Sequence, residues 1–167
     1  MGRIERFCPK SLEFVNQLVN FAKRKMKKEF KRQVTVYGDY FKKFKRTLSQ
    51  QTIKKIYQVL VYIMTLDVIP QTYLKSISGV PGLFEIRVED QGNIYRIFCC
   101  MDEGNLVILF NGFKKKTQKT PRKEIETAKR IMKEYFSNKN KVEDHGWRKD
   151  ETVESDTDRG FDRGRFR

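Results

Sequence analysis

The sequence predicts a small α+β protein, with a twisted antiparallel sheet, a pair of helices packed on it and a further helix at the C-terminus. Three apolar runs joined by short polar turns, over residues 83–90, 94–101 and 106–110, predict an antiparallel meander. Apolar residues at helical spacing after residue 50 and again after residue 121 predict the main helices. A chain of 167 residues fits one such domain with extensions.

The N-terminal part, residues 1–33, is predicted to be a basic helical extension. Apolar residues recur in it at helical spacing and are followed by a cationic run over 23–28. An alternative is that Met26 is the natural start, which leaves residues 1–25 as an appended segment. Residues 34–37 then form a short β-type run, and a short basic helix is expected to reach Arg46.

The next helix has a clear start and stop. Ser49 has the character of an N-cap, and Leu48 and Ile53 are placed to form a hydrophobic staple around it. The helix is expected to end near Asp67, because Pro70 forces the residue before it out of helical geometry. This helix and the short basic helix before it are expected to lie as an antiparallel pair against the sheet.

The strand over 83–90 alternates cleanly between two faces. Phe84, Ile86 and Val88 share one face, and Glu85, Arg87 and Glu89 share the other, so Arg87 is expected to point away from the core. The run over 106–110 is apolar at every position, which predicts burial on both faces.

The last helix is expected to start at Thr120 and Pro121, which suit a cap and a first-turn residue. Its buried stripe is predicted to be Ile125, Ala128, Met132, Tyr135 and Phe136. After Lys141 the composition becomes charged and nearly free of aliphatic residues, which predicts a disordered tail. The expected boundaries are therefore an extension over 1–33, a domain over 34–141 and a tail over 142–167.

The charge of the chain indicates a polyanionic partner. The net charge is +15, and residues 1–141 carry 30 Lys and Arg against 13 Asp and Glu. Nucleic acid is the expected partner, because each neutralised phosphate releases counterions. No stretch is apolar enough to span a bilayer, and three cysteines without metal-ligand spacing favour a reducing cytoplasm.

The residue types restrict the chemistry. The only histidine, His145, lies in the predicted tail, and no carboxylate cluster is spaced to hold Mg²⁺, so no metal or other cofactor is expected. A nuclease of this composition has to act mainly through cations. RNA permits this, because its own 2′-hydroxyl can attack the adjacent phosphorus while arginines stabilise the phosphorane.

Two groups of residues are candidates for this chemistry. Arg87 and Arg96 lie on neighbouring predicted strands and are the expected phosphate-stabilising pair. The expected RNA contacts are cations on the two helices and around the end of the last strand, with one aromatic ring for base stacking: Lys42, Lys43, Lys54, Lys114, Lys119 and Phe113.

The run Gly112-Phe113-Lys114-Lys115-Lys116-Thr117-Gln118-Lys119-Thr120-Pro121, with Arg87 and Arg96 before it, resembles the RelE/HigB superfamily of bacterial toxins in its phage-derived branch. The resemblance covers about residues 34–138. It implies a RelE-like fold and a toxin of a type II toxin–antitoxin module. Such a toxin cuts mRNA in the ribosomal A site without metal and is neutralised by a cognate antitoxin, expected here to be of helix-turn-helix type.

Carried over by residue, the family's strand-borne basic residues fall on Arg87 and Arg96, and its basic loop after the sheet falls on Lys115 and Lys116. The chain departs from RelE at Glu85, where a lysine is usual, and near Ile125, where a tyrosine is usual. The proton-transfer roles therefore stay open between Glu85, Lys115, Lys116 and no base at all.

Two other functions remain open at this stage. The same fold serves gyrase-poisoning toxins of the ParE type, which lack the ribonuclease residues. A non-catalytic RNA- or ribosome-binding module would also use a basic surface, and its binding would depend steeply on salt without any cleavage.

Overall fold

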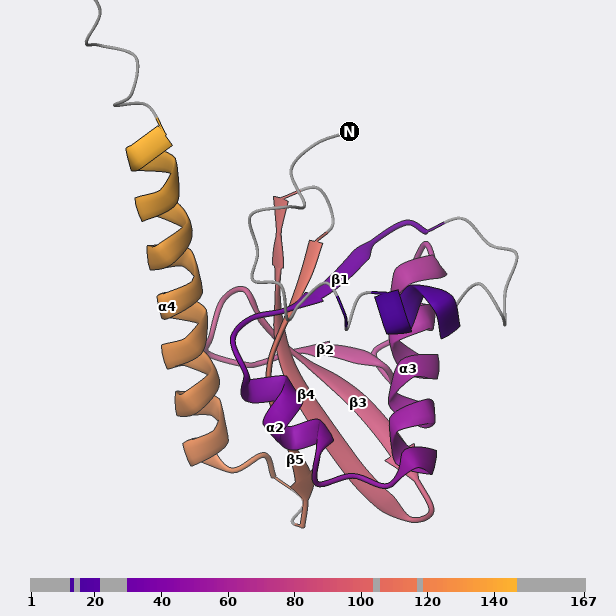
Figure 1. Ribbon diagram of the computed structural model, residues 1–167. Helices are drawn as coiled ribbons and strands as arrows, with labels where there is room; N and C mark the ends of the chain where they lie inside the picture. Colours follow the sequence, from indigo (N-terminus) through magenta and orange to yellow (C-terminus); the bar gives the residue numbers. More distant parts are fainter. Residues whose placement is uncertain (1–12, 14–15, 22–29, 104–105, 117–118, 147–167) are drawn as a thin grey trace, which may run out of the picture. The chain divides into compact units, whose positions relative to one another are not determined.

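The computed structural model confirms the predicted α+β class: a five-stranded sheet lies between helices (Figure 1). It describes residues 13, 16–21, 30–103, 106–116 and 119–146. The chain divides into two units, Met1–Tyr135 and Phe136–Arg167. The elements are β1 Gln33–Val36, α2 Tyr40–Lys45, α3 Gln50–Thr65, β2 Leu74–Ser76, β3 Leu83–Asp90, β4 Asn93–Asp102, β5 Leu106–Lys115 and α4 Arg122–Gly146.

The strands lie in the order β1-β5-β4-β3-β2. The three central strands form the predicted antiparallel meander. At one edge β1 pairs with β5 in parallel, and at the other edge β2, which the sequence did not indicate, pairs with β3 antiparallel. The sheet is therefore mixed, and the expectation of an antiparallel sheet needs this correction. A parallel pair needs a long crossover, and the chain between β1 and β5 supplies it.

The turn between β3 and β4 fixes the register of the central hairpin. Gln91 and Gly92 both have positive φ, at 49° and 73°, as a two-residue turn of type I′ requires. Starting from this turn, the residues of β3 and β4 pair one to one along the hairpin. This register places Arg87 opposite Arg96 and Glu85 opposite Phe98.

One face of the sheet carries the main hydrophobic core. Ile86, Val88 and Ile97 are buried there together with the apolar face of α3. The predicted N-cap of α3 is confirmed, since Ser49 Oγ accepts a hydrogen bond from the Thr52 amide at 3.1 Å. The helix ends at Thr65, close to the expected position.

The opposite face carries a second apolar layer under the first half of α4. Ala128, Ile131 and Tyr135 of this helix are buried, and the Tyr135 ring centroid lies 6.4 Å from that of Phe110. The residues from Val107 to Phe110 are fully buried, which confirms the doubly buried strand. Both faces of β5 are thus covered by apolar side chains.

The described part of the N-terminal extension belongs to the core. Residues 16–21 are helical, Leu18 is fully buried in the main core, and the Phe21 ring meets Tyr57 edge to face with centroids 5.9 Å apart. At the other end α4 continues to Gly146, so the first residues of the predicted tail are helical. Residues 147–167 lie outside the described part of the chain.

Candidate anion-binding site

A buried carboxylate organises the charged residues on the α4 side of the sheet. Glu85 Oε1 lies 3.2 Å from Arg87 Nε and 3.6 Å from Arg96 Nε. The arginines meet this carboxylate because Arg87 is two residues along β3 on the same face, and Arg96 is its direct partner on β4. The three side chains bring one negative and two positive charges together.

A fourth residue, Thr120, closes this group from the segment before α4. Its hydroxyl donates to Glu85 Oε2 at 3.2 Å. The sequence assigned Thr120 to the helix cap, but α4 begins at Arg122 and the Pro121 carbonyl accepts the first helical hydrogen bonds. Thr120 therefore lies one position too early to cap the helix and instead fixes the carboxylate. Glu85, Arg87, Arg96 and Thr120 are called the Glu85 cluster below.

The two arginines of the Glu85 cluster differ in their access to solvent. The Arg87 side chain is 30% exposed, whereas the Arg96 side chain is only 4% exposed. Burial is the main cause that lowers the pKa of Arg96, and repulsion from Arg87 adds to it, while Glu85 acts in the opposite direction. Arg96 also donates through Nη1 to the Tyr95 carbonyl at 3.1 Å. Arg87 is thus the arginine of the pair that can reach a ligand.

Both arginines keep an unused donor. Their Nε atoms are buried and lie within ion-pair distance of Glu85, but among the described residues neither N–H has a hydrogen-bond acceptor. A buried donor without an acceptor costs free energy, about 1–3 kcal/mol for each. The cluster therefore has hydrogen-bonding capacity that its own carboxylate does not satisfy.

Lys115 extends the positive charge of the cluster toward solvent. It is the last residue of β5 and is paired with Ile94 of β4. Ile94 is paired with Glu89 of β3, so Lys115 lies on the same face of the sheet as Glu89 and Arg87. Burial lowers the pKa of Lys115, repulsion from Arg96 lowers it further, and attraction to Glu85 partly opposes them. Its ammonium group is therefore easier to deprotonate than that of an ordinary lysine.

The expectation that the lysine run forms a loop was partly wrong. β5 continues through Gly112 to Lys115, so Lys114 and Lys115 are strand residues on opposite faces of the sheet. Lys116 follows the strand and is exposed, as is Lys119 beyond it.

The other predicted RNA contacts do not join the Glu85 cluster. Lys42 and Lys43 are exposed on α2, and Lys54 is exposed on α3, both of which pack on the other face of the sheet. Phe113 is on the cluster's face, but its ring stacks on Phe98 with centroids 5.8 Å apart. The sequence thus grouped residues that the fold places on two faces.

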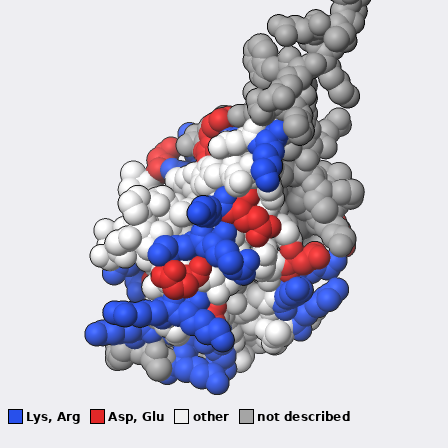
Figure 2. Space-filling view, turned by 90° about the vertical axis from the view of Figure 1, so that its left-hand side faces the viewer, with Lys and Arg blue, Asp and Glu red and all other residues white. Residues whose placement is uncertain are grey.

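Figure 2 shows the side of the molecule that carries α4, with many Lys and Arg side chains and a few acidic ones between them. Within the described part of the chain, no group of three His, Cys, Asp or Glu residues is arranged to hold a metal ion. No helix among those residues is long and apolar enough to cross a membrane.

The sequence missed one residue beside the cluster, Lys75, and the structure gives Tyr135 a role away from it. Lys75 on β2 is the direct partner of Glu85 on β3, and it was missed because a three-residue edge strand leaves little pattern. Tyr135 is the tyrosine of α4, but it is buried and its hydroxyl donates to Asp102 at 2.5 Å. It anchors the helix to β4, and its pKa is raised by burial and by this hydrogen bond.

The fold and the site together define a small basic α+β protein with a candidate anion-binding cluster on its sheet. The chain belongs to the family described as phage derived protein Gp49-like (DUF891), whose family model matches residues 24–133. This family is associated with toxins of the RelE and HigB type. No curated protein matches the chain.

Proposed function

We propose that this protein is the toxin of a type II toxin–antitoxin module and acts as a ribosome-dependent, metal-independent mRNA endonuclease. The observation that carries the proposal is the Glu85 cluster, where the 30% exposed side chain of Arg87 lies beside a buried arginine and a buried carboxylate in a strongly basic chain. A phosphodiester can accept hydrogen bonds from the exposed guanidinium of Arg87, and guanidinium groups bind its oxygens more strongly than neutral donors do. The family match adds the association with toxins.

In the proposed reaction, the 2′-oxygen of the RNA attacks the adjacent phosphorus. The P–O2′ bond forms, the P–O5′ bond breaks, and the products are a 2′,3′-cyclic phosphate and a free 5′-hydroxyl. One proton leaves the 2′-hydroxyl and one is delivered to the departing 5′-oxygen. The phosphorane between these steps gains negative charge on its equatorial oxygens, which preorganised cations stabilise.

We assign Arg87 to the phosphorane oxygens because it is the more exposed arginine of the cluster. Arg96 is buried and acts as a positioning residue, since it holds Glu85 beneath Arg87 and adds positive potential. Both Glu85 oxygens are engaged, one by the arginines and one by Thr120, so this carboxylate is poorly placed to accept a proton.

Lys115 is the proposed proton-transfer group. Its lowered pKa increases the neutral amine that can accept the 2′-hydroxyl proton. Lys116, which follows it in the chain, and Lys119 are exposed and are assigned to neighbouring phosphates of the mRNA. The proposed protein partner is a helix-turn-helix antitoxin with an acidic segment, which would neutralise this positive surface.

Primer extension on a defined mRNA tests the proposal. The protein is incubated with the mRNA alone and with translating ribosomes. Cleavage that needs ribosomes and follows the reading frame is the expected result. Cleavage of the mRNA alone would overturn ribosome dependence, and no cleavage in either tube would overturn the enzymatic function in favour of a gyrase-directed or purely RNA-binding protein.

The same assay tests the site. Arg87→Ala is expected to lower the cleavage rate by about 10²–10³-fold, as loss of one preorganised transition-state donor typically does. Arg130→Ala is the matched control, because this exposed arginine on α4 pairs with Glu134 at a long distance of 3.9 Å and is not part of the Glu85 cluster. Cleavage that survives in a folded Arg87→Ala variant would contradict the assignment.

A further inference from the structure

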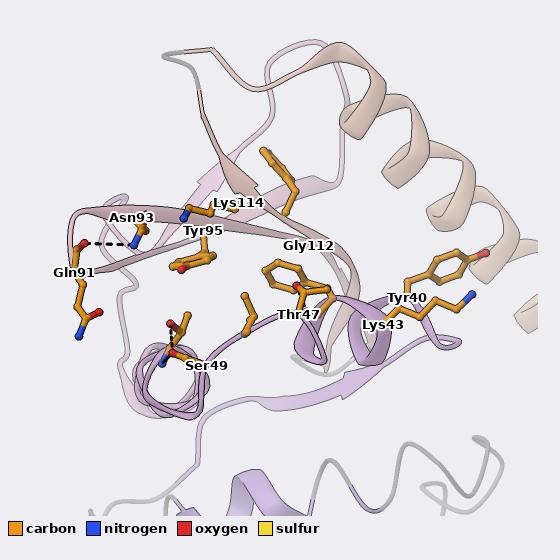
Figure 3. Close-up of a pocket in the computed structure, with 13 residues that line it drawn as sticks. Tyr40, Lys43, Thr47, Ser49, Gln91, Asn93, Tyr95, Gly112 and Lys114 are labelled. Carbon is orange, nitrogen blue, oxygen red and sulfur yellow. Dashed lines mark hydrogen bonds between the residues drawn. The ribbon is translucent and has the colours of Figure 1, made fainter.

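A polar groove lies between α2, the start of α3 and the ends of β4 and β5. Its volume is about 690 Å³. Figure 3 shows it running from the Gln91–Asn93 turn at one end, past Tyr95 and Ser49, to Tyr40 and Lys43 at the other. We call it the α2–β5 groove, and its size suits a small organic ligand.

The α2–β5 groove lies on the opposite face of the sheet from the Glu85 cluster. Lys114 and Gly112 of β5 pair with Tyr95 and Ile97 of β4, which belong to the main core. The intervening Phe113 pairs with Arg96 of the Glu85 cluster. Because neighbouring residues of a strand point to opposite faces, a ligand in the groove would not touch the Glu85 cluster directly.

The floor of the groove depends on close approach of α2 to β5. A Cβ on Gly112 would lie 2.9 Å from Phe44 Cγ and still closer to two other carbons of that ring. Glycine at this position therefore leaves room for the Phe44 ring against the strand. Beside it Tyr95, which is 7% exposed, forms part of the floor.

The charge and the polar groups of the groove select a particular kind of ligand. None of the described residues that line it is acidic, and Lys43 and Lys114 provide two exposed ammonium groups. Thr52, which lines the groove, donates through Oγ1 to the Asp90 carboxylate at 2.8 Å. The groove therefore favours a ligand with negative charge.

The uncharged groups favour a ligand that also has a planar heterocycle. The amides of Gln91 and Asn93 lie at one end, where they can donate to and accept from the edge of a base. Tyr40, half-buried at the other end, offers an aromatic face for stacking. Hydroxyl groups of Thr47 and Ser49 lie between them.

We propose that the α2–β5 groove binds one nucleotide of a single-stranded RNA, with its phosphate on the lysines and its base among the amides and rings. Single-stranded RNA fits because an unpaired base can leave its stack and enter a groove of this size. This second RNA contact goes beyond the proposed cleavage and does not require it. The protein would then contact RNA at two separate sites, one on each face of the sheet.

Titration of the ¹⁵N-labelled protein with adenosine, guanosine, cytidine and uridine 5′-monophosphates tests the groove. The Asn93 side-chain amide and the Gly112 amide are expected to shift with at least one nucleotide, and inorganic phosphate at the same concentration is expected to shift them much less. No shift with any nucleotide, equal shifts with phosphate, or shifts confined to Arg87 and its neighbours would each overturn the proposal.

Variants separate the groove from the cleavage site. Lys114→Gln is expected to weaken nucleotide binding by about three- to tenfold, as loss of a charge-assisted contact does. Lys55→Gln, an exposed lysine of α3 that does not line the groove, is the control and is expected to leave binding unchanged. Binding that persists in the Arg87→Ala variant would support the groove whatever that variant does to cleavage. Binding lost with Arg87→Ala would contradict a separate site.

Discussion

Arg87 and Arg96 are directly opposed on adjacent antiparallel strands, and one buried carboxylate oxygen of Glu85 lies within 3.6 Å of the Nε of each. Two like charges in direct opposition destabilise a sheet unless a counter-charge separates them. The structure places that counter-charge in the interior of the site, which leaves the outer side of Arg87 for a ligand.

Replacing Glu85 with Gln is expected to destabilise the fold by about 3 kcal/mol, because it leaves a buried arginine without its counter-charge. The measurement is urea unfolding followed by circular dichroism. Glu89→Gln is the control, since Glu89 is exposed on the same strand and face, and it is expected to change stability by less than about 0.5 kcal/mol. Equal effects of the two substitutions would contradict the role of Glu85.

Replacing Thr120 with Val keeps the shape of the side chain and removes the donor to Glu85 Oε2. We expect a loss of about 1 kcal/mol in the free energy of unfolding and a slower cleavage rate. Thr120→Ser should restore both. Thr127→Val, which removes an exposed bond to the Lys123 carbonyl, serves as the control. A Thr120→Val protein with unchanged cleavage would show that the hydroxyl does not position the site.

Gly112→Ala is expected to destabilise the protein by about 1–3 kcal/mol, because the new methyl group overlaps the Phe44 ring. Combining it with Phe44→Leu should recover part of this loss by making room. A double-mutant cycle in urea measures the coupling. If the losses in unfolding free energy from Gly112→Ala and Phe44→Leu simply add, contact with the Phe44 ring is not the reason that residue 112 must be glycine.

The pKa of Lys115 is expected to lie below the ordinary lysine value of 10.5. The folded chain therefore loses this proton at a lower pH than the unfolded chain, and the contribution of Lys115 to stability improves as pH rises through the window below 10.5. A ¹³C-lysine NMR titration measures the midpoint. Arg87→Gln should raise it by removing a repelling cation, and a midpoint that does not move would contradict this cause.

Leu18→Ala is expected to destabilise the fold by about 2–4 kcal/mol, as emptying a fully buried leucine site does. Asn20→Ala, at an exposed position of the same helical segment, should have little effect. Equal stability of the two variants would contradict a role for Leu18 in the main core.

The strongest local patterns predicted the fold. The sequence predicted the three central strands from period-two alternation, the Ser49 cap from its residue type, and the end of α3 from the following proline. Each of these signals acts within a few residues of the chain. The parallel pairing of β1 with β5 was missed, since it joins segments about 70 residues apart and has no local signal.

The site was predicted in part. Its residue types were found, but strand alternation beyond Gly112 divides the lysines between two faces, and Thr120 bonds to a carboxylate 35 positions earlier instead of capping its own helix. Only the tertiary structure shows which cations share a surface.

The parallel pairing of β1 with β5 also imposes an order on events during synthesis. Gln33–Val36 leaves the ribosome long before its partner Leu106–Leu109, and the hydroxyl that fixes Glu85 arrives later still, at residue 120. A nascent chain therefore cannot assemble the Glu85 cluster until residue 120 has been made.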